Sequence, residues 1–179
     1  MLEVPQALLD ERRARGVDRW DEMWEGELHM VPPGSVEHQR VGAELFLVLG
    51  PLAKANGLVP FYDATGVFRP GADNDWRAPD NVFARSEALS ARGIEGAASL
   101  VVEILSPNDE TYRKLDWYAE VGVGEVLVVE PETRRVELFA NRDGRMIPVE
   151  PVAIECLGVR AETVDAKLHL TWDGGTADI

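Results

Sequence analysis

The sequence predicts an α/β fold of the mixed α+β kind, with a central β-sheet flanked by helices. Residues 100–130 follow the order strand, turn, helix, turn and strand, which is typical of a βαβ unit with buried parallel strands. Residues 36–55 have the length and apolar spacing of a long helix. Residues 135–140, RVELFA, alternate apolar and polar side chains after a turn, as the second strand of a hairpin does.

The composition bounds the class of protein. A chain of 179 residues with 45% hydrophobic and 28% charged residues predicts a globular protein, and we take residues 1–179 as one domain. There is no apolar run of about 18 residues and no secretory h-region at the N-terminus. The single cysteine, Cys156, lies among apolar residues and cannot form an internal disulfide. We therefore expect a cytoplasmic protein with no membrane span.

The net charge of −14 argues against a large basic surface for nucleic acid, because phosphates are bound mainly by Lys and Arg. It leaves room for a local site, since a metal ion can neutralise a few carboxylates and contact phosphate itself.

The elements before residue 100 have local signals. Ser35 is a good N-cap for the helix over 36–55, and Gly57 is expected to end it. The remaining elements expected here are a short helix over 7–16 and strands over 27–31, within 58–68 as one strand or a kinked pair, and over 81–84.

In the βαβ unit, the strand covers Leu100–Leu105. Ser106 as N-cap, Pro107 at N1 and Asp109 near N3 predict the start of the helix. Gly122 suits the left-handed position after the helix, and the next strand covers Glu125–Val129. Further strands are expected over 146–151 and 167–172, followed by a frayed tail over 173–179.

Glu103 is anomalous because a carboxylate inside a buried strand is costly unless it is paired or coordinated. A buried salt bridge to Lys114 or to an arginine is one explanation. A metal ligand is the other, and Asp80 favours it, because Asp80 stands at the start of the strand over 81–84. Two carboxylates on adjacent strands can hold Mg²⁺, and a lysine can orient water or stabilise developing negative charge.

The order P-D followed by E resembles the PD-(D/E)XK nuclease superfamily. The strings RAPDNVF, VVEILSP and KLDWYAEVGVGEVLVVEP, with GELHMVPPGSVEHQRV upstream, are similar to the Uma2 family of restriction-endonuclease-like proteins, also called DUF820. The resemblance covers roughly residues 25–140. It implies a restriction-endonuclease-like core and cleavage of phosphodiester bonds that depends on Mg²⁺ or Mn²⁺.

Carried over residue by residue, the resemblance implies metal binding by Asp80, by Glu103 and by the backbone carbonyl of Ile104. Asp80, Glu103 and Lys114 are then the catalytic residues. The superfamily lysine normally stands two residues after the glutamate, where this chain has Leu105, and Lys114 matches the helix lysine of Uma2-like sequences. Glu110 and Glu130 occupy places where the family usually has Asp.

A helix that folds back along the strand brings Lys114 level with Glu103, because about 12 Å of helix runs against about 10 Å of strand. Leu105 is expected to share the face of Glu103, since strand residues two apart point to the same side. Tyr118 lies one helical turn further on, and we interpret it as a core aromatic. The sequence leaves open whether Tyr118 also has a role in the site, and it leaves the roles of four more residues open: Glu37, His38, Glu44 and Glu110.

The expected function is a metal-dependent endonuclease that uses a metal-activated water, with nucleic acid, and DNA in the first place, as substrate. Two alternatives stay open: a non-catalytic binding or regulatory module with the nuclease fold, and a hydrolase of small phosphodiesters. A basic cleft beside Asp80 would favour the nuclease, and a uniformly acidic rim would favour the other two. The pattern permits a homodimer.

Overall fold

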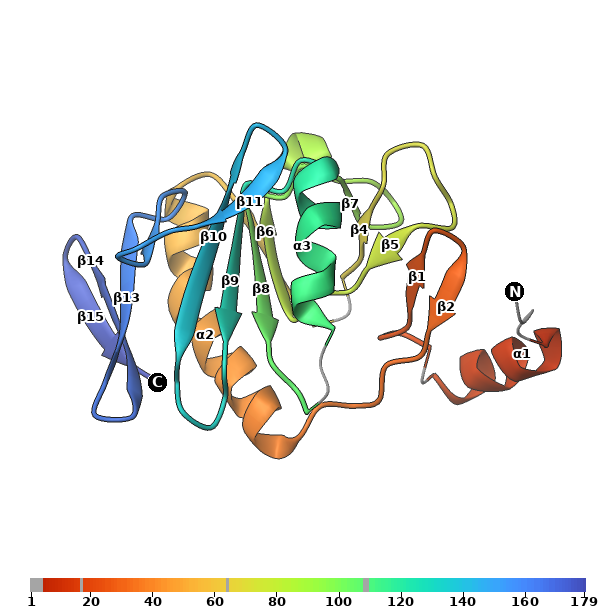
Figure 1. Cartoon of the computed structure of the whole chain (residues 1–179), viewed down its shortest axis with the longest axis horizontal. Coiled ribbons are helices and arrows are strands. Elements are labelled where there is room, and N and C mark those ends of the chain that lie inside the picture. Colours follow the sequence, from red (N-terminus) through yellow and green to blue (C-terminus); the bar gives the residue numbers. More distant parts are fainter. Residues whose placement is uncertain (1–4, 17, 64, 108–109) are drawn as a thin grey trace.

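The computed structural model describes residues 5–16, 18–63, 65–107 and 110–179. Figure 1 shows a sheet at the centre, a four-stranded meander at one end and a smaller sheet with the first helix at the other. The helices are α1 (Gln6–Arg15), α2 (Val36–Ala55) and α3 (Thr111–Glu120), with a 3₁₀ turn, η1 (Ser86–Ala88). No helix in these described ranges is long and apolar enough to cross a membrane.

The central sheet has six strands in the order β11-β10-β9-β8-β6-β3. Strands β8 and β9 pair in parallel and α3 connects them, whereas the other neighbouring pairs are antiparallel. The sheet is therefore mixed, and the predicted fold class and βαβ unit are confirmed. Its strands are β3 (Val59–Tyr62), β6 (Asn81–Ala84), β8 (Leu100–Ile104), β9 (Glu125–Val129), β10 (Val136–Arg142) and β11 (Arg145–Pro148).

Helices α2 and α3 cover opposite faces of this sheet (Figure 1). Side chains alternate across a strand, so Val102 and Ile104 of β8 pack in the cluster with α2, while Val101 packs with Trp117 and Tyr118 of α3. Glu103 has the same parity as Val101 and therefore faces α3. Leu105 also packs in the α3 cluster, as its spacing from Glu103 predicts.

Two smaller sheets flank the central one. The first has the order β2-β1-β5-β4-β7 and the second the order β12-β13-β14-β15. The residues 58–68 are thus divided between sheets, because β3 and β4 belong to different ones. The strands of the two smaller sheets are β1 (Glu22–Trp24), β2 (Glu27–His29), β4 (Val67–Phe68), β5 (Trp76–Arg77), β7 (Ile94–Glu95), β12 (Ala153–Ile154), β13 (Val159–Val164), β14 (Lys167–Trp172) and β15 (Gly175–Asp178).

The prediction of a frayed C-terminal tail is wrong. Residues Gly175–Asp178 form β15, which pairs with β14. Ile179 exchanges two backbone hydrogen bonds with Leu168 and is only 9% exposed in the main hydrophobic cluster. The tail is therefore an edge strand: β14 supplies its pairing partner, and its own Ile179 anchors it in the core.

The helix termini follow the sequence in part. The Ser35 side chain accepts a hydrogen bond from the backbone N–H of His38, and Gly122 has a φ of +90° after α3, both as predicted. The predicted start of α3 at Ser106 and Pro107 is wrong, because the helix begins at Thr111. Leu105 continues the pairing with β9 through its N–H, and Ser106 and Pro107 line a cavity. Asp109 lies outside the described residues.

Candidate active site

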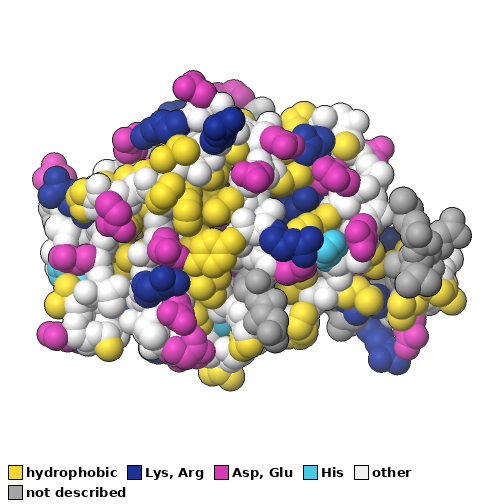
Figure 2. All heavy atoms as spheres, viewed as in Figure 1, with side chains coloured by type: hydrophobic (Ala, Val, Ile, Leu, Met, Phe, Trp, Pro, Cys, Tyr) yellow, Lys and Arg dark blue, Asp and Glu magenta, His cyan; other side chains and the backbone are white. Residues whose placement is uncertain are grey.

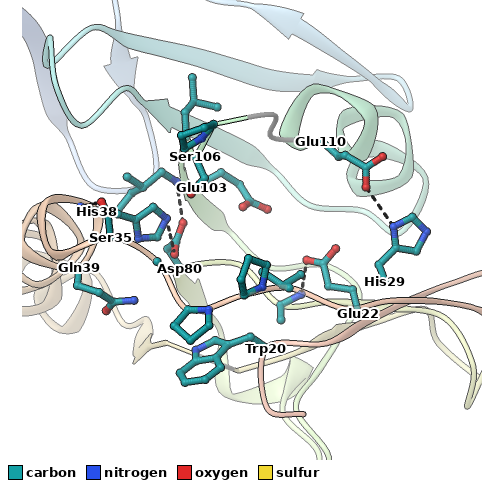
Figure 3. Close-up of a pocket in the computed structure, with 18 of the residues that line it drawn as sticks. Trp20, Glu22, His29, Ser35, His38, Gln39, Asp80, Glu103, Ser106 and Glu110 are labelled. Atoms are coloured by element: carbon teal, nitrogen blue, oxygen red, sulfur yellow. Dashed lines mark hydrogen bonds and ion pairs between the residues drawn. The ribbon is translucent and has the colours of Figure 1, made fainter. Parts of the chain in front are cut away.

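Asp80 and Glu103 face each other across two neighbouring strands. Strands β6 and β8 are antiparallel, and Asn81 pairs with Val102, so Asp80 lies opposite Glu103. The Asp80 carboxylate accepts a hydrogen bond of 2.7 Å from the backbone N–H of Ile104. Both carboxylates line one cavity of about 410 Å³ (Figure 3). Lys114 lines the same cavity.

Helix α3 returns along β8 and brings Lys114 to Glu103, as the chain geometry predicts. Lys114 Nζ lies 3.2 Å from Oε1 and 3.3 Å from Oε2 of Glu103. The Tyr118 hydroxyl, one turn further along the helix, donates a 2.5 Å hydrogen bond to Glu103 Oε1. Tyr118 is fully buried, so it is a core aromatic and also a direct partner of the carboxylate.

Glu22 is a member of this cluster that the sequence reasoning missed. Its Oε1 lies 2.8 Å from Lys114 Nζ, although the two residues are 92 positions apart. Glu22 also accepts hydrogen bonds from the Trp24 indole and from the Ala78 backbone N–H, and its side chain is 2% exposed. The only local signal is a Glu at the start of a short strand, which is too common to mark a site.

His38 lies on the other side of Asp80, with its Nε2 3.4 Å from Asp80 Oδ1. The helix cap at Ser35 positions its backbone, and the ring packs against Gly34. A Cβ on Gly34 would lie 2.6 Å from His38 Nδ1, so a larger residue there would displace the ring. The sequence left the role of His38 open, and in the structure its side chain lies beside Asp80.

The other three undecided residues divide between the cavity and the surface. Glu110 lines the cavity and lies 3.1 Å from His29 Nδ1. Glu37 pairs with Arg40 and Arg134, and Glu44 pairs with Arg40. Neither Glu37 nor Glu44 is among the described residues that line the cavity.

The cluster holds more negative than positive charge. Burial raises the pKa of Glu103 to about 7; the Lys114 charge opposes this shift, while Glu22 and Asp80 add to it. Burial also acts to raise the pKa of Glu22, but the charge and hydrogen bond of Lys114 outweigh it and hold that pKa below its usual value. Burial and the adjacent Glu103 raise the pKa of Tyr118 well above its usual value. Glu103 is thus the carboxyl that a further cation would stabilise most.

The donor set fits a hard divalent cation. Mg²⁺ binds through one or two carboxylates and keeps several waters, and Asp80 and Glu103 offer two carboxylates on one cavity wall. Among the described residues there is no group of three or more His, Cys, Asp or Glu side chains arranged for a metal. A site built here would therefore rely on two carboxylates, backbone oxygen and water. The roles of Asp80, Glu103, Lys114 and the Ile104 carbonyl stay predictions.

Comparison with known families agrees with this arrangement. The family model of Uma2, described as "Putative restriction endonuclease", matches residues 16–162. The match covers most of the chain, so this protein belongs to the Uma2 family, as the sequence strings predict.

One of the solved structures that align with the chain shows the same fold. The crystal structure of "a putative nuclease belonging to DUF820" from Anabaena variabilis ATCC 29413 aligns with a TM-score of 0.58 and 16% identity, over 74% of this chain and 78% of that one. The DrdV–DNA complex aligns with a TM-score of 0.38 and 13% identity, over 76% of this chain and 11% of that one, which is too weak to carry an argument. No curated protein matches the chain.

Proposed function

We propose that this protein is a metal-dependent nuclease that hydrolyses phosphodiester bonds of nucleic acid at the Asp80–Glu103–Lys114 cluster. The observation that carries the proposal is the placement of two carboxylates and one lysine on a single cavity wall, with the pKa of Glu103 raised to about 7. Titratable groups with strongly shifted pKa values that line a cavity are common at catalytic sites, and this supports the proposal.

In this proposal Asp80 and Glu103 hold Mg²⁺ or Mn²⁺, with the Ile104 carbonyl as a further contact. When bound, the ion supplies polarisation of a phosphate oxygen and a water of lowered pKa. Tyr118 and the Ile104 N–H hold the two carboxylates in place through their hydrogen bonds. Lys114 stabilises the negative charge that develops on the phosphate.

The reaction adds water across one bond. The water oxygen bonds to phosphorus and loses a proton, while the phosphorus–oxygen bond to the leaving nucleotide breaks and that oxygen takes up a proton. No covalent enzyme intermediate is involved in this scheme.

A second reading has a specific observation in its favour. Lys114 lies between Glu22 and Glu103, so the cluster also satisfies itself as a buried ion-pair network. The cavity is also not a basic cleft, because Lys114 is the only Lys or Arg among its described lining residues. Both features suit a non-catalytic module with the nuclease fold or a hydrolase of small phosphodiesters.

Calorimetric titration with Mg²⁺ and Mn²⁺ separates these readings. We expect the wild type to bind one ion, and Asp80→Asn and Glu103→Gln to weaken binding at least tenfold. Glu162→Gln is the matched control, since Glu162 is exposed on β13, away from the cavity. A labelled oligonucleotide should be cleaved only with metal, and not by Asp80→Asn. If the folded wild type binds no metal, the metal-dependent nuclease is refuted, and the non-catalytic module is the function that remains.

A further inference from the structure

The charge around the cavity bears on what can enter it. The described lining residues include six carboxylates and a single lysine, and that lysine is hydrogen-bonded to Glu22 and Glu103. The two lining histidines, His29 and His38, each lie beside a carboxylate. The lining carboxylates are Glu22, Asp63, Asp80, Glu103, Glu110 and Glu132. A polyanion therefore meets little positive charge here.

Duplex DNA presents one negative charge per about 1.7 Å of axis, and its specific binding proteins commonly neutralise about 6–10 phosphates with Lys and Arg. On the face in Figure 2, basic and acidic side chains are interspersed, and no continuous basic band crosses that face. Of the lining carboxylates, Glu132 is exposed, and Glu110 is half-buried and paired with Arg113. We expect a duplex laid over the cavity to bring phosphates near both residues. Repulsion at these points disfavours a paired substrate.

One wall of the cavity is apolar. The segment between β2 and α2 supplies Met30, Val31, Pro32 and Pro33, and the first two side chains are 50% and 38% exposed. Trp20 adds an aromatic surface to the same cavity (Figure 3). Nucleic acid bases have apolar faces that bind such surfaces without sequence preference, and this needs the bases to be unpaired and unstacked.

The size of the cavity agrees with this. At about 410 Å³ it lies in the range of about 300–1,000 Å³ that is typical of pockets for small ligands. One or two nucleotides can enter such a space, whereas a duplex cannot.

We infer that the cavity accepts nucleic acid as an unpaired strand of one or two nucleotides, with a base against the Met30–Pro33 wall and its phosphate at the cation that Asp80 and Glu103 would hold. This inference rests on the proposed metal-dependent nuclease and names its substrate class. Recognition depends on one phosphate and on apolar contact with the base, and the acidic rim rejects duplex.

Fluorescence anisotropy tests the inference with full-length protein, Ca²⁺ in place of Mg²⁺, a labelled single-stranded hexanucleotide and a labelled 12-base-pair duplex. We expect the hexanucleotide to bind at least tenfold more tightly than the duplex. The slope of log K against log salt should be about −0.7 to −1.4, the value for one or two phosphate contacts on a single strand. Tighter binding of the duplex with a slope steeper than about −5 would overturn the inference.

Variants at the rim and the wall sharpen the test. Glu132→Lys should tighten duplex binding at least threefold, and Glu162→Lys, the same change at a remote exposed site, should leave it unaltered. Met30→Ser with Val31→Ser should weaken hexanucleotide binding at least threefold at an unchanged salt slope. Ile147→Ser on β11 is the control, since Ile147 is 45% exposed and does not line the cavity. Equal effects of variant and control would refute the assignment.

Calorimetric metal titration of the same protein distinguishes failure of the substrate class from failure of the proposed nuclease function. Metal binding without oligonucleotide binding would refute the substrate class and leave the metal site standing. Absence of metal binding would refute the nuclease itself, and the substrate class with it.

Discussion

Glu103 is a buried carboxyl whose surroundings work against its charge more than they support it. Lys114 and Tyr118 stabilise the ionised form, but burial and the charges of Glu22 and Asp80 oppose it, and the pKa rises to about 7. The ionised form of Glu103 is thus destabilised by its surroundings, and a bound cation would stabilise it strongly.

The pH dependence of stability follows from the sign of this shift. A folded pKa of about 7 lies above the ordinary value of 4.5, so the folded state holds the Glu103 proton more tightly than the unfolded state. The stabilisation is complete below pH 4.5 and is lost as pH rises through 7. We predict that the melting temperature of the wild type, relative to Glu103→Gln, falls between pH 5 and pH 8 in EDTA.

Melting curves of both proteins at four pH values in this interval measure the effect. Glu162→Gln is the control, because its carboxylate is exposed. A melting-temperature difference between wild type and Glu103→Gln that stays constant from pH 5 to pH 8 would contradict the raised pKa of Glu103.

At the scale of elements, the turn after α3 depends on a close backbone approach. Gly96 precedes β8 with a φ of +67°, and a Cβ added to it would lie 2.5 Å from the Val121 carbonyl oxygen. Gly122 then starts the return to β9 in the left-handed conformation. This close approach joins the segment that enters β8 to the C-terminal end of α3.

We predict that Gly96→Ala destabilises the protein more than Gly71→Ala does. Gly71 also has a positive φ, +76°, but nothing lies within 4 Å of a Cβ there. Both changes carry the backbone cost of about 1–2 kcal/mol for an L-residue in this region, and only Gly96→Ala adds a backbone clash. Urea unfolding of the two variants compares the free energies. Equal losses would show that the approach of Gly96 to Val121 is not tight.

At the scale of the whole molecule, the C-terminal meander contributes to the same core as the central sheet. Ile154, Leu168 and Leu170 pack in one cluster with α2 and with the strands β8, β9 and β10 (Figure 1). Ile179 closes this cluster at the chain end, and Arg134 donates a hydrogen bond to its backbone oxygen. The last residue is thus part of the fold.

We predict that Ile179→Ala lowers the free energy of unfolding by about 2 kcal/mol, at the low end of core Ile→Ala changes because the site is near the surface. Ile147→Ala, the same change at a 45% exposed position on β11, should cost less than about 1 kcal/mol. Chemical denaturation of both variants gives the comparison. A loss at Ile179 no larger than that at Ile147 would mean that the tail frays after all.

The sequence alone determined the βαβ unit, the helix over 36–55 with its Ser35 cap, the hairpin after β9 and the family. Hydrophobic periodicity, capping residues and short motifs predict these features, and each of these signals involves residues only a few positions apart. The approach of Lys114 to Glu103 also followed from the lengths of strand and helix between them, whereas Asp80 was added from its place at a strand start and from the family resemblance.

Only the tertiary structure decided the rest. Glu22 reaches Lys114 across 92 positions, His38 reaches Asp80 from another element, and the tail becomes a strand because β14 is there to pair with it. The start of α3 at Thr111 rather than at Ser106 was likewise not visible in the capping residues of the sequence. Such contacts leave no local pattern, because their free energy comes from burial and pairing between segments that only the folded chain brings together.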